Sequence, residues 1–217
     1  MSTTYCHPGE SPLECDAYIF DFDGTLANIG DLNMRALRAG LAAFDVEVTL
    51  EWLQAEPILC IADVRRRLAR DNRRQPDCAD IDLYRSASAY WTAHVSELRP
   101  VETVVTVARR SSVPMAVASA NDATLVQAGL AALGLADLFP VVLGRQHAPR
   151  LKPSPDVFLL AASRLRIEPD RCLVYENTDA GVSAARSAGM AVVDVRAWET
   201  PSKQSVQASP PRAGAPT

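Results

Sequence analysis

Two carboxylates that stand two residues apart are the first group in this sequence whose spacing suits chemistry. They belong to the run Asp21-Phe22-Asp23-Gly24-Thr25-Leu26, which follows the short apolar stretch Ala17-Tyr18-Ile19-Phe20. A buried strand that ends at Asp21 and turns at Gly24 lets both carboxylates converge on one metal ion or reacting group, because glycine accepts the backbone angles of a tight turn. Such a pair also occurs in ordinary loops, so it does not establish a site by itself.

Three further polar clusters follow along the chain: Ser119-Ala120-Asn121, Lys152-Pro153 and Glu176-Asn177. Each has an ordinary interpretation when taken alone, as a helix cap, a solvated lysine and a second helix cap. Together with the first pair they supply two carboxylates, a hydroxyl, an ammonium and further oxygen ligands at the same end of a predicted sheet. That set suits phosphoryl transfer through an aspartyl-phosphate, with Mg²⁺ neutralising the phosphate.

Apolar and amphipathic segments alternate after Pro100, and this alternation predicts the elements that must position the polar clusters. We expect strands at 17–20, 115–118, 141–143, 173–175 and 191–195, and helices at 101–110, 122–133, 155–165 and 178–188. Strands that are apolar throughout indicate parallel βαβ units with both faces of the sheet covered. Between residues 31 and 98 the apolar residues recur at helical spacing, with Pro57 and Pro76 as breaks, so this block is expected to be helical.

The chain is therefore expected to be an α/β protein whose sheet is interrupted after its first strand by a helical insert. We expect a flexible N-terminus over 1–15, an α/β core formed by 16–28 and 99–197, a helical cap over 29–98 and a disordered tail over 198–217. An insert at this point lies over the carboxyl ends of the strands, where open α/β sheets bind ligands.

The composition is that of an ordinary globular protein. The 217 residues are 48% hydrophobic and 22% charged, with a formal net charge of -4. Because a mildly acidic chain is a poor candidate for binding nucleic acid, we interpret the arginines between Arg65 and Arg74 as a solvated helix face, with a basic lip that steers anionic substrates as the alternative. The odd number of scattered cysteines and the lack of a long apolar run predict a cytoplasmic protein with no membrane span.

The polar clusters resemble the four signatures of the haloacid dehalogenase (HAD) superfamily of phosphohydrolases. The run from Asp21 to Leu26 is similar to the first signature, and Ser119 to the second. The third and fourth correspond to Lys152-Pro153-Ser154-Pro155-Asp156-Val157-Phe158 and Glu176-Asn177-Thr178-Asp179-Ala180-Gly181. The resemblance implies a Rossmann-like three-layer core with a parallel sheet and an inserted all-helical cap domain.

The similarity runs from about Ala17 to Val195. It is strongest to the β-phosphoglucomutase-like subgroup with a helical cap, and residues 114–196 look most like bacterial fructose-1-phosphate phosphatase-type members. The joint signature is specific for the superfamily and says little about the substrate.

The resemblance also implies roles for individual residues. Asp21 would be the nucleophile and a ligand of Mg²⁺, and Asp23 would be the general acid and base, with its backbone carbonyl on the metal. Ser119 would hold phosphate oxygens, and Asn121 is the second candidate for that role. Lys152 would neutralise the phosphate and orient Asp21.

The metal site implied by the resemblance is completed by Glu176 and Asn177, and here the sequence departs from the family. The family usually has Asp where this chain has Asn177, so the site loses one negative charge. An amide carbonyl still ligates Mg²⁺, but weaker metal binding is expected unless Asp179 compensates. This departure keeps open a catalytically weak, phosphate-binding descendant.

The function expected from these residues is a Mg²⁺-dependent phosphatase acting on a small phosphorylated metabolite such as a sugar phosphate. A phosphomutase of the β-phosphoglucomutase type is the alternative, although Asn33 and Cys60 stand where the mutase has a histidine and an arginine in its cap. On the cap side of the pocket, Asn33 and Glu56 are the candidate substrate-contacting residues. The pattern favours neither a monomer nor a dimer, and it indicates no nucleic-acid or membrane partner.

Overall fold

A computed structural model describes residues 15–56, 58 and 60–198 of the chain. The expected flexible N-terminus (1–15) and disordered tail (198–217) lie outside the described residues, except for residues 15 and 198. Both expectations stay predictions. Within the described ranges, no helix combines the length and the apolar character that a membrane crossing needs.

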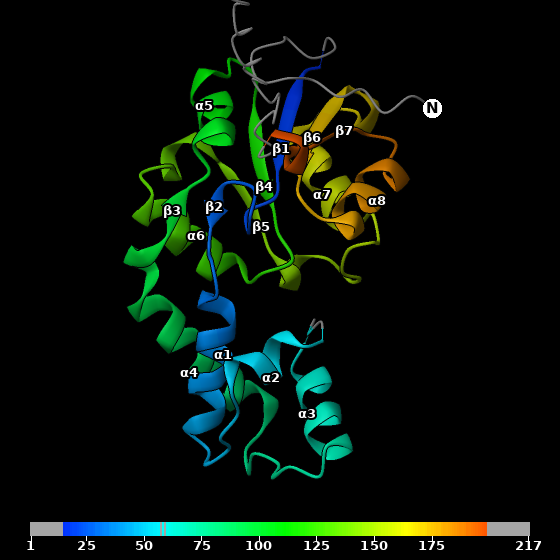
Figure 1. The fold of residues 1–217 in the computed structure, drawn as a ribbon. Coiled ribbons are helices and arrows are strands. Elements are labelled where there is room, and N and C mark those ends of the chain that lie inside the picture. Colours follow the sequence, from blue (N-terminus) through cyan, green and yellow to red (C-terminus); the bar gives the residue numbers. More distant parts are fainter. Residues whose placement is uncertain (1–14, 57, 59, 199–217) are drawn as a thin grey trace, which may run out of the picture.

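A five-stranded parallel sheet forms the centre of the molecule (Figure 1). Its strands are β1 (Ala17–Phe20), β4 (Met115–Ala118), β5 (Val141–Leu143), β6 (Cys172–Glu176) and β7 (Ala191–Asp194), in the order β5-β4-β1-β6-β7. β1 is central, and Tyr18 is in register with Met115 on one side and Leu173 on the other. Because the chain builds first to one side of β1 and then to the other, a crevice is expected at the carboxyl ends of these strands.

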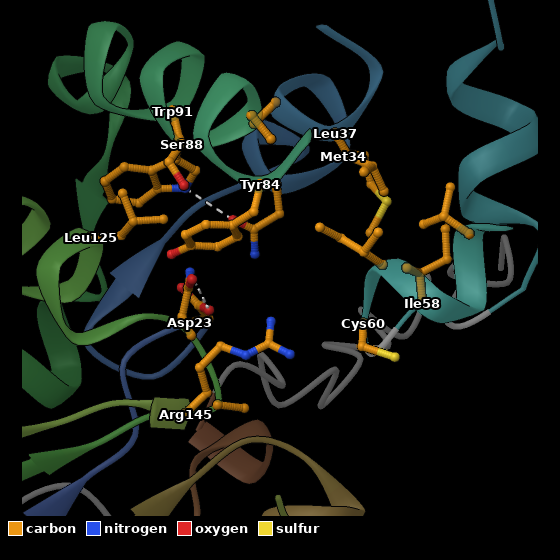
Figure 2. A pocket seen from close by; sticks show the side chains of 17 residues that line it. Asp23, Met34, Leu37, Ile58, Cys60, Tyr84, Ser88, Trp91, Leu125 and Arg145 are labelled. Atoms are coloured by element: carbon orange, nitrogen blue, oxygen red, sulfur yellow. Dashed lines mark hydrogen bonds between the residues drawn. The ribbon is translucent and has the colours of Figure 1, made fainter. Parts of the chain in front are cut away.

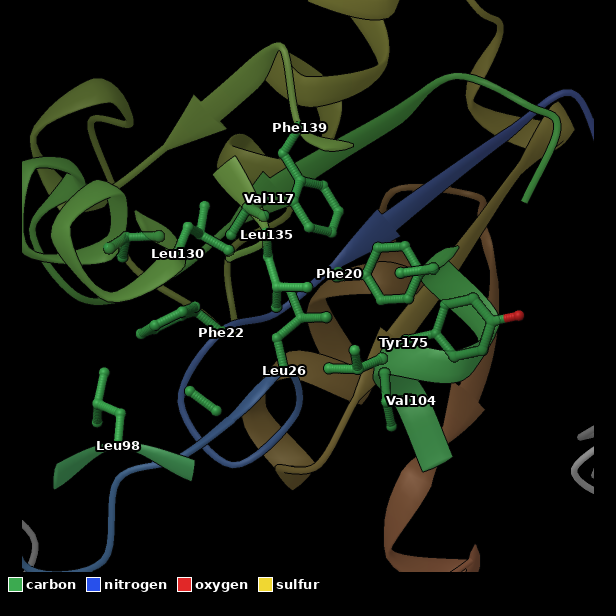
Figure 3. Close-up of a cluster of buried hydrophobic side chains, with 14 of the residues drawn as sticks. Phe20, Phe22, Leu26, Leu98, Val104, Val117, Leu130, Leu135, Phe139 and Tyr175 are labelled. Carbon is green, nitrogen blue, oxygen red and sulfur yellow. The ribbon is translucent and has the colours of Figure 1, made fainter. Parts of the chain in front are cut away.

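Helices cover both faces of this sheet. Helices α5 (Glu102–Arg110) and α6 (Ala123–Ala132) pack on one face, and α7 (Asp156–Leu165) and α8 (Asp179–Ser187) pack on the other (Figure 1). Successive side chains of a strand point to opposite faces, so Phe20 joins the first cluster and Ile19 the second. In the first cluster Phe20 stacks on Tyr175 with ring centroids 4.7 Å apart (Figure 3). The buried strands are thus fixed from both sides.

A separate group of helices lies beyond the carboxyl ends of the strands. These are α1 (Leu32–Ala42), α2 (Leu50–Gln54), α3 (Ile61–Arg70) and α4 (Asp80–Ala93) (Figure 1). Gly40 lets α1 and α4 approach closely, because a Cβ built there would lie 3.0 Å from that of Ala87. The group has its own apolar cluster, formed by Leu41, Val46, Val48, Leu53, Val64, Leu68 and Leu83. The predicted fold class, an α/β core with an inserted helical cap, is confirmed.

A two-stranded antiparallel ribbon joins the core to the cap. It pairs β2 (Ala27–Asn28) with β3 (Arg99–Pro100), and the Val101 amide adds a hydrogen bond of 3.0 Å to the carbonyl of Leu26. The two crossing segments therefore run side by side where the cap begins and ends. The sequence predicts no strand here, because two residues are too few for an apolar period. The domain boundaries at 28/29 and 98/99, which fall at this ribbon, remain a proposal.

Candidate active site

The four polar clusters lie at one edge of the sheet because the strand hydrogen bonds continue into them. The amide of Asp21, directly after β1, donates to the carbonyl of Tyr175 in β6 at 3.0 Å. The amide of Ser119, directly after β4, donates to the carbonyl of Leu143 in β5 at 2.9 Å. The register of the sheet thus fixes where these side chains leave the backbone.

The ammonium of Lys152 joins the first and fourth clusters. Its Nζ donates to Oδ1 of Asp21 at 2.6 Å and to Oε2 of Glu176 at 2.7 Å. All three side chains are buried, with exposed fractions of 6% for Lys152, 8% for Asp21 and 1% for Glu176. The Lys152 Nζ also lies 4.7 Å from the ring centroid of Phe158, so the ammonium packs over an aromatic ring as well. Because Lys152 holds only Oδ1 of Asp21, the second oxygen of that carboxylate is left for other partners.

The second oxygen of Glu176 is held by the start of α8. Its Oε1 accepts hydrogen bonds from the amides of Asn177 and Thr178, at 2.8 and 2.9 Å, and from the hydroxyl of Thr178 at 2.9 Å. Gly181 in the first turn of the helix makes room for the carboxylate, since a Cβ there would fall 1.8 Å from Oε2. Glu176 is therefore fixed at both oxygens, and it positions Lys152.

Asp23 faces the cap with one oxygen held and the other free. Its Oδ2 accepts a hydrogen bond of 3.1 Å from Nδ2 of Asn121, while its buried Oδ1 has no hydrogen-bond partner among the described residues. Asn33 on α1 lies beside Asp23. The Trp91 indole fixes the orientation of Asn33 by donating a hydrogen bond of 2.9 Å to its Oδ1. The cap thus reaches the candidate acid through Asn33.

Burial raises the pKa values of both aspartates. Burial raises the pKa of Asp21 to about 7, and the Lys152 ammonium only partly opposes this effect. Burial likewise raises the pKa of Asp23 to about 6, against the lowering effect of the Asn121 and Asn33 amides. Burial alone would lower the pKa of Lys152, but the Asp21 and Glu176 carboxylates outweigh it and raise that pKa. A carboxyl group with a pKa near 6 is suited to give and take a proton near neutral pH.

Ser119 is buried at the start of the loop that follows β4. Its Oγ accepts a hydrogen bond of 3.0 Å from the amide of Asn121, so the hydroxyl hydrogen is free to point elsewhere. Asn121 is itself braced, because its Oδ1 accepts from the amide of Asp122 at 2.8 Å. Of the two side chains predicted to bind phosphate, Asn121 therefore contacts Asp23, and Ser119 is bound to Asn121 directly after β4.

Asn177 lies against the loop that carries the two aspartates. Its Oδ1 accepts a hydrogen bond of 3.2 Å from the Thr25 hydroxyl, and a Cβ at Gly24 would fall 2.1 Å from its Nδ2. Gly24 has a φ of 81°, so both its backbone angle and its lack of a side chain are needed for this contact. The amide at position 177 is thus at the edge of the Asp21 carboxylate cluster.

The donor set at this edge fits Mg²⁺ held by few protein ligands. Asp21 and Glu176 bring two buried carboxylates, and Asp23 brings a partly buried one, against the single ammonium of Lys152, so a dication would balance them. Among the described residues, no group of three or more His, Cys, Asp or Glu side chains is placed to hold a metal ion. Mg²⁺ usually keeps several waters beside one or two carboxylates, so a magnesium site does not need a third acidic ligand.

Two residues named in the sequence analysis lie away from this cluster. Glu56 does not line the site cavity, and its two carboxylate oxygens instead bind the guanidinium of Arg70 at 2.8 and 2.9 Å. Asp179 has a side chain that is 92% exposed and pairs with Arg196, so its carboxylate faces solvent in this structure. The sequence does not show which way either side chain points.

The arginines of α3 also differ from the expected solvated face. Arg67 is only 7% exposed, and its guanidinium carbon lies 4.2 Å from the ring centroid of Trp52. Arg65 pairs with Asp80 and donates to two main-chain carbonyls. The prediction of a wholly solvated face is therefore wrong for Arg67, because the indole of Trp52 offers it a flat packing surface.

A cavity of about 270 Å³ opens between Asp23 and the cap (Figure 2). Asn33 lies in its wall as expected, whereas the sequence analysis did not identify Tyr84 of α4 or Arg145, which follows β5. Neither belongs to a recognisable motif, and Arg145 could have been noticed only as a charge directly after a predicted strand.

The chain belongs to the haloacid dehalogenase-like hydrolases. The model of that family matches residues 18–195, which is most of the chain and includes every polar cluster of the site. The expected family and the expectation of a hydrolase are therefore confirmed.

Similar proteins include a phosphatase and solved structures of the same fold. The fructose-1-phosphate phosphatase YqaB of Escherichia coli is 32% identical over 186 residues, which cover 82% of this chain and 95% of that protein. The crystal structure of CbbY from Rhodobacter sphaeroides in complex with phosphate has a TM-score of 0.68 at 25% identity, covering 82% of this chain and 84% of that one. A putative β-phosphoglucomutase from Thermotoga maritima, at 22% identity and a TM-score of 0.62 over 82% of this chain and 83% of that one, shares the fold.

Substituting Gly181 with alanine should disturb the site without touching a reacting group. The new methyl group would meet the Glu176 carboxylate, which cannot move freely because its other oxygen is bound by α8. We expect catalytic activity to fall by about ten-fold or more as Lys152 shifts, although alanine favours the helix itself by about 1 kcal/mol. Activity assays and thermal unfolding of Gly181→Ala measure both effects.

The matched control for that experiment is Ser183→Ala in the same helix. Ser183 is exposed, so its substitution should leave activity unchanged. Equal activities of Gly181→Ala and the wild type would show that the position of Glu176 does not matter for turnover.

Proposed function

We propose that this chain is a Mg²⁺-dependent phosphatase that hydrolyses a small phosphorylated metabolite, with sugar phosphates as the first candidates, through an aspartyl-phosphate on Asp21. The observation that carries the proposal is the Lys152 ammonium bound to Oδ1 of Asp21 and Oε2 of Glu176, with Asp23 free at one oxygen beside the cavity. The similarity to a fructose-1-phosphate phosphatase supports the choice of substrate class.

The first half of the reaction would use both aspartates. The free oxygen of Asp21 attacks phosphorus, and the bond from phosphorus to the leaving oxygen breaks. Asp23, in its acid form, gives its proton to that oxygen, so the product leaves as a neutral alcohol. Lys152 offsets charge next to Asp21, and the Ser119 hydroxyl and the Asn121 side chain would hold phosphate oxygens.

The second half would return the enzyme to its starting state. Asp23, now a carboxylate, takes a proton from water, and the resulting hydroxide attacks phosphorus and releases Asp21 and inorganic phosphate. The Asn121 amide keeps Asp23 in place through both steps. Asp21, the Asp23 carbonyl, Glu176 and Asn177 are the residues that would hold Mg²⁺, which when bound supplies positive charge against the phosphate oxygens.

The small cavity argues for a compact leaving group. At about 270 Å³ it suits a sugar or a shorter polyol rather than a macromolecule. A phosphomutase of the same fold would pass the phosphate back to a sugar, and no feature of the described residues favours that outcome over transfer to water.

Replacing Asp21 with asparagine should abolish turnover and leave the protein folded. The amide has almost the volume of the carboxylate, but it removes the attacking oxygen. We expect phosphate release from the best substrate in a panel of sugar phosphates and nucleotides to fall by more than about a thousand-fold. Circular dichroism and thermal unfolding check the fold.

The control for this experiment is Asp137→Asn, which removes a charge on the exposed surface and should keep full activity. If folded Asp21→Asn protein released phosphate at nearly the wild-type rate, Asp21 would not be the nucleophile. If the wild type released no phosphate from any compound in the panel, the phosphatase proposal itself would fail.

Asn177→Asp should strengthen Mg²⁺ binding. It restores a negative charge at the edge of the carboxylate cluster, and a screened charge pair at ligand distance is worth on the order of 1–4 kcal/mol. We therefore expect the Mg²⁺ concentration for half-maximal activity to fall by about ten-fold or more. The measurement is a Mg²⁺ titration of activity, or of thermal stability if the wild type is inactive.

Asn28→Asp serves as the control, because it adds the same charge on the exposed ribbon strand β2. An unchanged Mg²⁺ dependence in Asn177→Asp would mean that residue 177 does not face the metal. Activity that appears only in the mutant would instead favour a phosphate-binding descendant that has lost turnover.

A further inference from the structure

Arg145 is held beside the candidate phosphate loop by its own backbone. It begins a short 3₁₀ helix, Arg145–His147, directly after β5, and its amide donates to the carbonyl of Asn121 at 2.8 Å. The preceding Gly144 allows this contact, since a Cβ there would fall 2.2 Å from the amide nitrogen of Ala123. The turn therefore docks tightly, and it leads the Arg145 side chain into the cavity (Figure 2).

The guanidinium of Arg145 has no partner within the part of the chain that the structure describes. It forms neither a hydrogen bond nor an ion pair there, although it is only partly exposed. Arg150, in the same loop, does have a partner, because its Nε and Nη2 donate hydrogen bonds of 3.0 and 2.8 Å to the carboxylate of Asp156. A half-buried guanidinium with all its donors unused is well placed for an anionic ligand.

The cavity offers such a ligand no other positive charge. Asp23 and Arg145 are the charged side chains among the described residues that line it. Lys152 lies outside the lining and already serves two carboxylates. The cap side is largely apolar, with Met34, Leu37, Ile61 and Val64 in the wall, and Figure 2 shows Met34 and Leu37 on that side and Arg145 on the core side.

We propose that Arg145 determines specificity by binding a second anionic group, a carboxylate or a phosphate, carried by the leaving group of the phosphomonoester substrate. A planar guanidinium binds either group through two parallel hydrogen bonds. This inference rests on the proposed function, because it assumes that the scissile phosphate lies at Asp21. It narrows the substrate class to compact phosphomonoesters with an anionic end.

The test compares ligands that differ only in that second group. Glycerol 3-phosphate and 3-phosphoglycerate differ by a hydroxymethyl group against a carboxylate, and fructose 1-phosphate and fructose 1,6-bisphosphate differ by a second phosphate. Isothermal titration with the full-length Asp21→Asn protein and Mg²⁺ measures binding without turnover. In at least one pair, we expect the member with the second anionic group to bind about ten-fold more tightly. The pair that shows this difference tells whether the site prefers a carboxylate or a phosphate.

Arg145→Gln in the same background should reduce this preference to about two-fold or less, while the dissociation constant of the member without the second anionic group changes little. Arg145→Lys should keep part of the preference, since it keeps the charge but not the paired donors. Arg110→Gln is the matched control, because Arg110 is exposed on α5 and outside the cavity lining. The ligand preference of this variant should equal that of the Asp21→Asn protein.

Two results would overturn the inference: no preference for an anionic member in either pair, or a preference that survives Arg145→Gln. Phosphate release by the wild-type protein from the same four compounds is measured in parallel. A preference that depends on Arg145 but comes without phosphate release would reject the proposed phosphatase and keep the anion site. Release without such a preference would reject only the role of Arg145.

Discussion

The ammonium of Lys152, held between the carboxylates of Asp21 and Glu176, is the interaction on which the rest of the site depends. Its partners lie 131 and 24 residues away along the chain, so it forms only when β1, β6 and the loop before α7 are in their final places. Buried charges of this kind are costly unless each is paired. The sheet register, the start of α8 and the glycine at position 181 all serve to keep the three groups in contact.

The cap matters because it reaches the one reacting group that the core leaves partly free. Asn33, oriented by the Trp91 indole, lies beside Asp23, and Asn121 holds the same carboxylate from the core side. Asp23 is therefore one point at which the two parts of the molecule meet. A cap that closes over a substrate would exclude water and strengthen the electrostatic interactions at this carboxyl group. The ribbon of β2 and β3 carries both connections to the cap and sits directly after the loop of Asp23.

Much of this arrangement could be predicted from the sequence, because apolar strands and amphipathic helices leave strong periodic patterns. The observed β1 (Ala17–Phe20), β4 (Met115–Ala118) and β5 (Val141–Leu143) have the expected bounds, and the other core strands and helices differ by a residue at one or both ends. The ribbon was missed because strands of two residues have no period. The pairing of Glu56 with Arg70, the burial of Arg67 and the placement of Arg145 in the cavity depend on contacts between elements, which residue spacing does not encode.

The most direct test of the account is to trap phosphate on the protein. Wild-type protein is mixed with substrate labelled with ³²P in the phosphate group, quenched with acid during the first turnover and digested, and the labelled peptide is identified. The account predicts a label that is stable in acid, is released by hydroxylamine and maps to Asp21, and that is missing from Asp21→Asn protein. Rapid phosphate release with no label on the protein, or with the label on another residue, would contradict it.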